Sequence, residues 1–558
     1  MSTATTAERL DAAIAEFFSS WNIYSTILIL LLVVFLTYPL LTGKEPDTHP
    51  FLLARQAQIA PIRHTGESAV YRAIDMPHGY PLRAGLGVKD PGTPRWSSGR
   101  PGDLRDIWRV AVRGAVKEDG TPTGEKGKIL TVLGSEKVLD HQLEDITLGI
   151  NAIGQHVKRN NGQNVAVCLP NSVEMLSAIF AGSFYGFSTI LLPYGLPQDK
   201  LNSLLANTSA DHIIAEAGVL DLDGLHSANK ALNNVIWVSE AGSQHMDWSR
   251  DAPDGFTVNS WHDLVEKNNR SATSEVLPLD KDSQVPPVSI FCPATNGTYD
   301  LVKYTSEPSH PDFVLQNLIS GTAALLATLV RAYKLTSADT LLPTTSLTDS
   351  YTLCWTLAAL YSNASIALNS VAGDKIDILA ATAQSKPTIV IAAPGTIQKY
   401  LLSPATNLSA GLSKWMSTRA LQAGNLPSDP SGPLALSKLR VLLIPQSTSL
   451  PANTRLSSSA FHLLRTHLHA RIGYALTTPF VAGAVAQTNI LDYRDKGKQV
   501  CVGAPMSSIE LSLVGDEDVV GSHSPKGTVN IKGPAVVGGK ISLDVQAQID
   551  DDHTLLLL

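Results

Sequence analysis

The sequence predicts an α/β fold built on parallel sheets and preceded by an apolar helix near the N-terminus. From residue 139 onward, apolar strand-like runs alternate with helix-like runs, the pattern of a parallel sheet covered on both faces. Residues 23–41 form an uncharged apolar stretch close to the length of a membrane-crossing helix. The 558 residues, 44% hydrophobic and 17% charged, describe a globular chain long enough for two or three domains.

The charge and the cysteines argue against a nucleic-acid-binding surface and against a fold held together by disulfides. A net charge of −7, with no lysine and arginine run interleaved with aromatics, is not typical of a nucleic-acid surface, so we expect no nucleic-acid partner. Four separated cysteines, Cys168, Cys292, Cys354 and Cys501, make no disulfide framework and predict reduced thiols. Cys292 has no adjacent histidine or cation to lower its pKa, so we interpret it as a small buried residue.

Residues 23–42 are predicted to form a transmembrane helix that anchors the chain in the lipid bilayer. The stretch carries no charge, and Trp21, Tyr24 and Tyr38 lie near its ends, where aromatic rings prefer the membrane interface. A cleaved secretory signal, the alternative, requires a basic start and a cleavage site with small residues. Acidic residues precede the stretch and Tyr-Pro-Leu-Leu closes the apolar run, so we interpret it as a retained anchor.

The flanking residues predict how the anchor is set in the membrane. Apolar side chains recur at helical spacing in residues 1–22, which indicates an amphipathic lead on the membrane or a simple extension of the anchor helix. Arg9 is the one basic residue before the span, whereas Lys44 and Arg55 follow it. Basic residues favour the cytosolic side. We therefore expect a single-pass protein with residues 44–558 in the cytosol, at the endoplasmic reticulum or a lipid-associated membrane.

A leader and a main domain follow the anchor. Residues 43–138 are rich in proline, glycine and arginine and predict a leader that wraps around the core. The apolar run 315–330 contains a Gln-Asn pair and a glycine, and predicts a buried helix rather than a second span. Residues 139–558 predict the α/β domain, whose first helix-like and strand-like runs are residues 143–157, 164–169, 173–181, 188–193, 211–216 and 234–238.

A candidate anion-binding loop follows the strand-like run at residues 287–290. Residues 291–303 read Phe-Cys-Pro-Ala-Thr-Asn-Gly-Thr-Tyr-Asp-Leu-Val-Lys. A loop that wraps a phosphate needs glycines, so that backbone N–H groups can approach, together with hydroxyl groups and a lysine. Thr295 and Gly297 supply part of that set, whereas the carboxylate of Asp300 would repel a triphosphate.

This loop resembles the phosphate-binding loop of the adenylate-forming superfamily, which includes acyl-CoA synthetases, luciferases and peptide-synthetase adenylation domains. The family motif is Tyr-Thr-Ser-Gly-Ser/Thr-Thr-Gly-x-Pro-Lys-Gly. Ala294, Tyr299 and Asp300 stand at its first glycine, its proline and its lysine. Long-chain acyl-CoA synthetases and fatty acyl-AMP ligases are the most similar members of the family. Further segments resemble family motifs in the same order along the chain, at residues 387–394, 439–443, 472–478, 502–505, 527–534 and 542–544 with 550–552.

The resemblance implies an adenylation domain of two doubly wound subdomains and a distorted barrel lobe, with a degenerate nucleotide site. Tyr474 and Thr477 are kept from the family's Tyr-Gly-x-Thr-Glu, and Asp544 stands at the ribose-binding position. Thr478 replaces the glutamate that holds Mg²⁺, and residues 444–448 crowd the adenine turn. The vestigial nucleotide-binding set, with no catalytic residue and no metal ligand, is Thr295, Asn296, Gly297, Thr298, Tyr474, Thr477, Thr478 and Asp544.

Three more departures concern charge and chain length. Thr528 stands where the family has a glutamate. Lys303 follows Asp300 by three positions and is interpreted as a solvated lysine rather than a substitute for the missing cation. The sequence stops at Leu558, so the resemblance implies that the small C-terminal domain with the catalytic lysine is absent.

These departures predict a membrane-anchored AMP-dependent synthetase-like protein that is catalytically inactive and acts as a scaffold or lipid-related partner of another protein. Such a protein requires no cofactor. The alternative is an active ATP-dependent enzyme that adenylates fatty acids or ligates them to CoA, with ATP, Mg²⁺ and CoA as cofactors. Retention of Tyr474, Thr477 and Asp544 supports the alternative. Nucleotide binding separates the two hypotheses.

Overall fold

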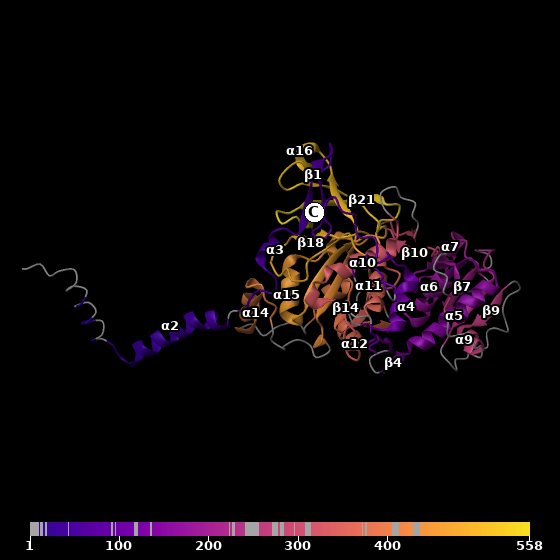
Figure 1. Ribbon diagram of the computed structural model, residues 1–558, viewed down its shortest axis with the longest axis horizontal. Helices are drawn as coiled ribbons and strands as arrows, with labels where there is room; N and C mark the ends of the chain where they lie inside the picture. Colours follow the sequence, from indigo (N-terminus) through magenta and orange to yellow (C-terminus); the bar gives the residue numbers. More distant parts are fainter. Residues whose placement is uncertain are drawn as a thin grey trace, which may run out of the picture.

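Two β-sheets, one of seven strands and one of fifteen, organise the chain in the computed structural model (Figure 1). The structure describes a few positions among residues 11–19, and then residues 21–42, 44–90, 93–94, 96–116, 121–133, 137–221, 224–225, 229–239, 256–269, 277–278, 284–294, 296–306, 314–370, 372–373, 376–403, 412–427 and 436–558.

The seven-stranded sheet is parallel except at one edge. Its strand order is β11-β10-β6-β5-β7-β8-β9, and β11 runs antiparallel to β10. The inner strands are buried on both faces, which explains why they read as continuous apolar runs. The predicted alternation of strands and helices is thus confirmed here. The strands are β5 (Asn164–Cys168), β6 (Ser188–Leu191), β7 (His212–Glu216), β8 (Asn234–Val238), β9 (Thr257–Ser260), β10 (Val288–Pro293) and β11 (Tyr299–Tyr304).

The fifteen-stranded sheet joins a parallel part to an antiparallel part. Neighbouring strands run parallel along β16-β15-β14-β12-β13-β3, and the pairs outside this stretch are antiparallel. The antiparallel part includes the yellow lobe at the top of Figure 1. The strands are β1 (Ala57–Arg63), β2 (Ala69–Ala73), β3 (Ile129–Leu133), β4 (Lys137–His141), β12 (Thr340–Pro343), β13 (Ser365–Asn369), β14 (Ile389–Ile391), β15 (Val441–Ser447), β16 (Arg471–Thr477), β17 (Ala486–Gln487), β18 (Val500–Pro505), β19 (Glu510–Val514), β20 (Lys526–Lys532), β21 (Lys540–Ile549) and β22 (Leu555–Leu557).

A layer of helices links the two sheets. Helices α10, α11, α4, α6 and α5 touch one another in that order, and the fully buried Trp108 and Trp355 lie within the layer. Helix α10 is buried over most of its length, as predicted for residues 315–330. The helices are α2 (Ile23–Thr42), α3 (Pro50–Ala54), α4 (Leu104–Arg113), α5 (Leu143–Arg159), α6 (Val173–Tyr185), α7 (Gln198–Ala206), α9 (Trp261–Asn269), α10 (Asn317–Thr328), η2 (Arg331–Tyr333), α11 (Ser350–Tyr361), α12 (Ile378–Thr382), α13 (Pro394–Leu401), α14 (Leu412–Gln422), η5 (Ala452–Thr454), α15 (Ser458–Leu468) and α16 (Glu517–Val520).

Local sequence signals set the ends of the linking helices. Asp103 and Asp106 form a reciprocal capping box at the start of α4. The Ser172 side chain caps α6 by accepting from a backbone N–H, and Gly186 ends that helix in the left-handed region with φ of +86°. Asp349 caps α11 in the same way as Ser172. These short polar residues and the glycine fix where the buried helices begin and end.

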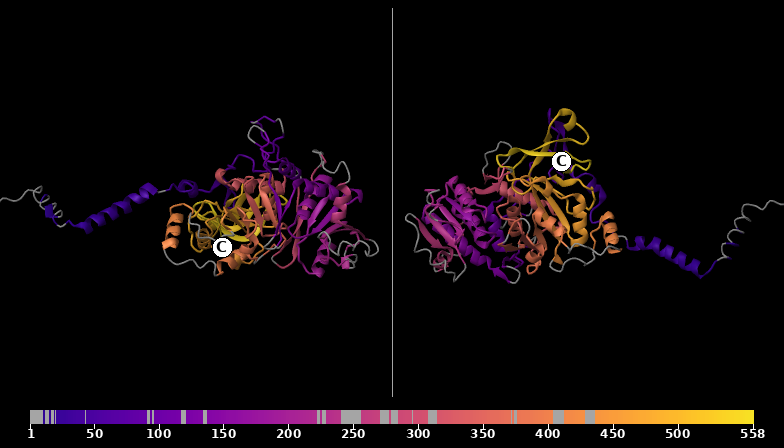
Figure 2. Two further views of the ribbon diagram at one scale, coloured as in Figure 1. Left: turned by 90° about the horizontal axis from the view of Figure 1, so that it is seen from below. Right: turned by 180° about the vertical axis from the view of Figure 1, so that it is seen from behind.

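Helix α2 projects from the body in all three views (Figures 1 and 2). It covers the predicted range 23–42, and its large apolar side chains are exposed over residues 23–36. Within α2, the side chains are described only as far as residue 37. Among the described residues of the chain, no helix is long and apolar enough to cross a membrane. The predicted lead at residues 1–22 lies largely outside the described residues.

The predicted leader contributes elements to both the sheet and the helical layer. Strands β1 and β2 form one edge of the fifteen-stranded sheet, and β3 and β4 form its other end. Helix α4 lies in the helical layer between the sheets. The sequence boundary at residue 138 falls inside β4. Much of the leader is therefore paired or buried within the body of the protein.

Candidate nucleotide site

The predicted phosphate loop is a β-hairpin with a short turn. Strands β10 and β11 pair antiparallel up to residues 294–298. The Ala294 N–H donates to the Thr298 carbonyl (2.9 Å), and the Gly297 N–H donates to the Ala294 carbonyl (3.2 Å). The N–H and the hydroxyl of Thr298 both donate to Asn296 Oδ1 (3.2 and 2.6 Å). The turn is closed on itself.

A closed turn cannot present these donors to a phosphate. Anion-binding loops work through unpaired backbone N–H groups, whereas the N–H groups of Ala294, Gly297 and Thr298 are all engaged inside the turn. Gly297 has a φ of +79°, so the turn itself requires a glycine there. Thr295 lies outside the described residues. The structure thus brings Asn296, Gly297 and Thr298 together as an exposed, self-bonded turn.

The side chains of Asp300 and Lys303 point to opposite faces of β11. Their Cα partners on β10 are Cys292 and Ser289, and positions three apart on a strand point to opposite sides. Both side chains are exposed, as predicted for a solvated lysine. Lys303 therefore does not stand in for a cation at the position where Asp300 places a carboxylate.

The ends of β15 and β16 hold a buried hydrogen-bond chain. Tyr474 is fully buried, and its hydroxyl donates to Gln446 Oε1 (3.0 Å) and accepts from the Leu456 N–H (3.1 Å). The Gln446 amide donates onward to Thr454 Oγ1 (3.2 Å). Burial raises the pKa of Tyr474 to about 12, so its hydroxyl stays protonated. The protein's own Gln446 side chain thus occupies the predicted adenine turn.

Thr477 and Thr478 are buried where β16 ends. The carbonyl of Thr477 accepts from the Thr448 N–H (2.9 Å), and that of Thr478 accepts from the Val481 N–H (3.2 Å). The Thr477 hydroxyl is buried without a hydrogen-bond partner among the described residues. Thr478 offers only a neutral hydroxyl at the position of the family's metal-binding glutamate. Across the described ranges, no three His, Cys, Asp or Glu side chains gather as a metal site would require.

Asp544 lies apart from the hairpin turn in the second sheet. It is exposed on β21, where exposed and buried side chains alternate. Its neighbour Gln546 donates across the strands to Thr528 Oγ1 (2.8 Å), so the threonine that replaces a family glutamate is engaged. No hydrogen bond among the described residues joins the predicted residues of one sheet to those of the other. The residues present do not fit ATP with Mg²⁺.

Sequence reasoning missed the residue that ties the hairpin to the larger sheet. Asn317, at the start of α10, is fully buried. Its Oδ1 accepts from the Thr305 N–H (2.9 Å), and its Nδ2 donates to the carbonyls of Pro534 and Val536 (3.0 Å each). A polar residue inside an apolar helical run is a sequence signal for such a buried bonding role.

Two polar groups near the hairpin are desolvated, Cys292 on β10 and Asp349 at the start of α11. Asp349 Oδ2 accepts from the N–H and the hydroxyl of Thr352 (3.1 and 2.9 Å), and burial raises the pKa of this carboxyl. Burial also raises the pKa of Cys292 to about 12, with Asp349 and Asp300 contributing repulsion. Cys292 is buried, as predicted, and its thiol stays protonated.

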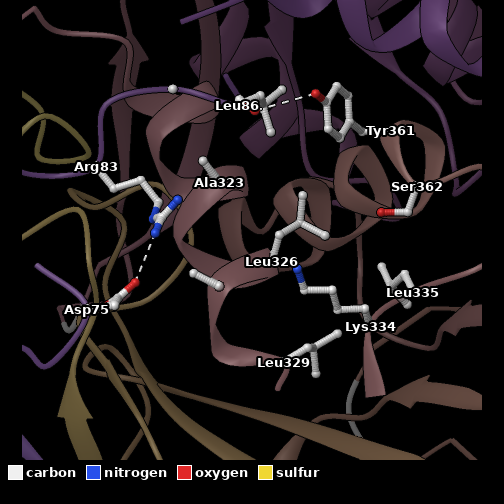
Figure 3. Close-up of a pocket in the computed structure, with 12 residues that line it drawn as sticks. Asp75, Arg83, Leu86, Ala323, Leu326, Leu329, Lys334, Leu335, Tyr361 and Ser362 are labelled. Carbon is white, nitrogen blue, oxygen red and sulfur yellow. Dashed lines mark hydrogen bonds and ion pairs between the residues drawn. The ribbon is translucent and has the colours of Figure 1, made fainter. Parts of the chain in front are cut away.

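Four cavities open elsewhere on the surface. One of about 500 Å³, shown in Figure 3, adjoins one of about 300 Å³, since Asp75 and Ala327 line both. Two others of about 580 Å³ lie beside helix α14 and beside Tyr80. None of the seven predicted nucleotide-binding residues that the structure describes lines any of these four cavities.

Comparison with known proteins identifies the fold. No protein-family model matches the sequence. The chain is 22% identical over 547 residues to YHR045W of Saccharomyces cerevisiae, an uncharacterized protein, covering 89% of this chain and 88% of that one. It is similar to the long-chain-fatty-acid-CoA ligase FadD1 of Archaeoglobus fulgidus (TM-score 0.54, 15% identity, 86% of each chain). The N-terminal domain of FACL13 of Mycobacterium tuberculosis is also similar (TM-score 0.55, 12% identity, 82% of this chain and 100% of that one).

The mixed α/β fold is that of the N-terminal domains of adenylate-forming enzymes, as the resemblance predicted. Solved structures with this fold include acyl- and aryl-CoA ligases and a luciferase-like enzyme. Their identities to this chain range from 11% to 15%. At that level the likeness concerns the fold, and chemistry has to be argued from the site itself.

Proposed function

We propose that this protein uses the adenylate-forming fold without forming acyl adenylates, and acts at a membrane as a scaffold or lipid-related partner of another protein. Support comes from the nucleotide site, where the protein's own groups bond the turn N–H groups of Ala294, Gly297 and Thr298 and the Tyr474 hydroxyl. Purification of the full chain from its native membrane would identify a partner as a protein recovered in a fixed ratio to it.

The closed turn at residues 294–298 carries the proposal. A triphosphate would have to break the hydrogen bonds of the turn and then meet the carboxylate of Asp300. Adenine would have to displace Gln446 from the Tyr474 hydroxyl. Losing one preorganised electrostatic contact costs about 10²–10³ in rate. The contacts of one site are not additive, so we expect a rate below detection without multiplying the penalties.

Pyrophosphate exchange into ATP tests the loss of adenylation. The full chain would be assayed in lipid nanodiscs with Mg²⁺ and fatty acids from short to very long, beside the Archaeoglobus fulgidus ligase in the same lipid. We expect no fatty-acid-dependent exchange above a mock purification. Exchange that depends on the acid and disappears in Asp544→Ala would contradict the proposal and favour the active ligase.

The membrane part of the proposal assigns α2 as the anchor and residues 44–558 to the cytosol. The exposed, uncharged apolar surface of a helix that stands off the body supports this assignment (Figure 2). Deletion of residues 1–42 should release the chain from carbonate-washed membranes, whereas the full chain stays bound. Retention of the shortened chain, or a glycan on Asn207 of the native protein, would contradict anchoring or orientation respectively.

A further inference from the structure

The two adjoining cavities form one groove along the second half of α10. Ala323 and Ala327 face the first cavity, and Ala324 and Ala327 face the second, so small side chains leave room along the helix. The cavities measure about 500 and 300 Å³, within the range of small-molecule sites. The groove is open rather than enclosed, and its two ends differ in chemistry.

One end of the groove carries two cations over an apolar wall. In Figure 3 the Lys334 side chain lies among Leu326, Leu329 and Leu335. Its ammonium makes no hydrogen bond or ion pair within the described part of the chain. Arg83 is held at the opposite wall, where Nη2 donates to Asp75 (2.9 Å).

The Arg83 guanidinium is further fixed by Nε, which donates to Ser507 Oγ (3.1 Å). Two cations therefore face one carboxylate, that of Asp75, at this end of the groove. The surplus positive charge suits an anionic oxygen group, and the positioned guanidinium is pre-organised for it.

The other end of the groove is apolar and open to solvent. Leu52, Ile74 and Val330 line it and are 58%, 47% and 38% exposed, and Met506 forms its buried floor. Apolar side chains on the wall of a groove suit the apolar part of a ligand. Leu52 belongs to α3, the first helix after α2, so this end lies on the segment that leads away from the proposed anchor.

The groove is distinct from the nucleotide site. Helix α10 begins at Asn317, which holds the end of the β10–β11 hairpin, and the groove lies along its last turns. At about 1.5 Å per residue, Thr328 is roughly 16 Å along the helix from Asn317. Of the predicted nucleotide-site residues that the structure describes, none lines the groove.

We propose that the groove binds a long-chain amphiphile with an anionic oxygen head group. The chain lies against Leu52, Ile74 and Val330, and the head group meets Lys334 and Arg83. A free fatty acid and an anionic phospholipid share this chemistry. The site stands whether or not the protein adenylates, because it uses none of the residues that pyrophosphate exchange would test.

Photolabelling of the full chain tests the site. The chain in phosphatidylcholine nanodiscs would be irradiated with a diazirine-bearing palmitate, and the labelled peptides identified by mass spectrometry. We expect saturable labelling of residues 323–335 or 72–86. Competition by unlabelled palmitate alone identifies a free-fatty-acid site, and competition by phosphatidic acid identifies a phospholipid site. Labelling confined to α2, or labelling that neither lipid competes away, overturns the proposal.

Photolabelling of three variants tests which residues contribute to lipid binding. Lys334→Gln should weaken labelling about tenfold by removing one charge-assisted contact. Ala327→Trp should block the groove, and both positions are exposed enough for the fold to tolerate them. Lys200→Gln changes an exposed lysine of α7, which does not line the groove; it is the matched control and should label like the unmodified chain. Equal labelling of all three variants would contradict the proposal.

Discussion

The hairpin turn and the ends of β15 and β16 are two of the places where the sequence resemblance expects ATP contacts, and their hydrogen bonds are made differently. In the turn, Asn296, Gly297 and Thr298 are exposed, and the hydrogen bonds of its described residues join them to one another. The strand ends are buried, and Tyr474 links Gln446 to the Leu456 backbone. In the turn, the hydrogen bonds join residues that are close in sequence. At the strand ends, they join segments that are far apart in sequence.

This difference predicts unequal costs for perturbing the two regions. Water can replace a lost hydrogen bond in the exposed turn, so side-chain changes there should cost little. A buried donor or acceptor left unpaired has no such substitute and costs about 1–3 kcal/mol. The strand ends should therefore contribute to folding stability, whereas the turn should tolerate change.

Tyr474→Phe should give the largest effect. It removes one hydroxyl and leaves Gln446 Oε1 and the Leu456 N–H without a partner in a buried region. We expect a loss of about 2–3 kcal/mol in the free energy of unfolding. Urea unfolding followed by tryptophan fluorescence would measure it.

Tyr194→Phe is the matched control for that variant. The Tyr194 ring is 42% exposed, and its hydroxyl donates to Glu216 at the surface (2.5 Å). Its loss should cost no more than about 0.5 kcal/mol, because water takes the place of the hydroxyl. Equal destabilisation by the two variants would remove the contrast between buried and exposed regions.

Asp349→Ala tests the cap of the buried helix α11 and should give an effect between those of the two tyrosine variants. It removes the cap of α11 and leaves the Thr352 N–H unpaired, whereas the Thr352 hydroxyl keeps its hydrogen bond with the Thr345 hydroxyl (2.6 Å). We expect a loss of about 1–2 kcal/mol. Asp377→Ala removes the exposed cap of the short helix α12 and should cost about 0.5 kcal/mol. Unfolding midpoints in urea would compare the two.

Asp349→Asn distinguishes the contribution of the capping hydrogen bond from the cost of the buried negative charge. Asn keeps an acceptor oxygen, and the folded-state pKa of Asp349 is raised by burial. The charged carboxyl therefore costs stability above its unfolded-state pKa of about 3.9, and this cost disappears as the pH falls below that value. We expect the Asn variant to be at least as stable as the unmodified chain at pH 7. That advantage should shrink as the pH approaches 4, and a constant advantage would contradict the electrostatic account.

The fold was largely predictable because its elements carry local periodicity. Residues 143–157 and 234–238 were predicted correctly as α5 and β8, since apolar spacing alone specifies them. Strand β2 in the leader was missed, because its pairing with β1 is broken by a register shift and its other neighbour, β19, lies more than four hundred residues later. Such pairing leaves no mark in the local pattern, so the leader showed little periodicity.

The candidate site was predictable only where a motif marks it. Gly297 was identified by its place in the loop, and its positive φ agrees with that choice. That Asn296 would bond to Thr298, or that Gln446 would turn inward to Tyr474, depends on the choice among several partners in three dimensions. Sequence spacing does not decide that choice, so the closure of the site emerged only from the structure.

Gly297→Ala tests how firmly the turn is fixed. An added Cβ meets nothing within 4 Å, so the cost arises from the φ of +79° alone. We expect a loss of about 1 kcal/mol, and a smaller loss for Gly297→Asn, because asparagine tolerates this conformation better. Urea unfolding would rank the two variants. A neutral Gly297→Ala would mean that the turn adopts another conformation in solution.

The smallest expected effect is that of ATP itself. A ligand at one hundred times its Kd stabilises a protein by about 2.7 kcal/mol, and a ligand at its Kd by about 0.4 kcal/mol. With 1 mM ATP and Mg²⁺ we expect the unfolding free energy of the full chain to change by less than about 0.4 kcal/mol. Asp300→Asn sharpens the test because it removes the repulsive carboxylate while the turn hydrogen bonds of Ala294, Gly297 and Thr298 remain in place. That variant should also show no ATP-dependent change, since closure of the turn, and not charge alone, excludes the phosphates. A shift of about 2 kcal/mol in Asp300→Asn would instead show that the turn opens for a triphosphate once the carboxylate is gone.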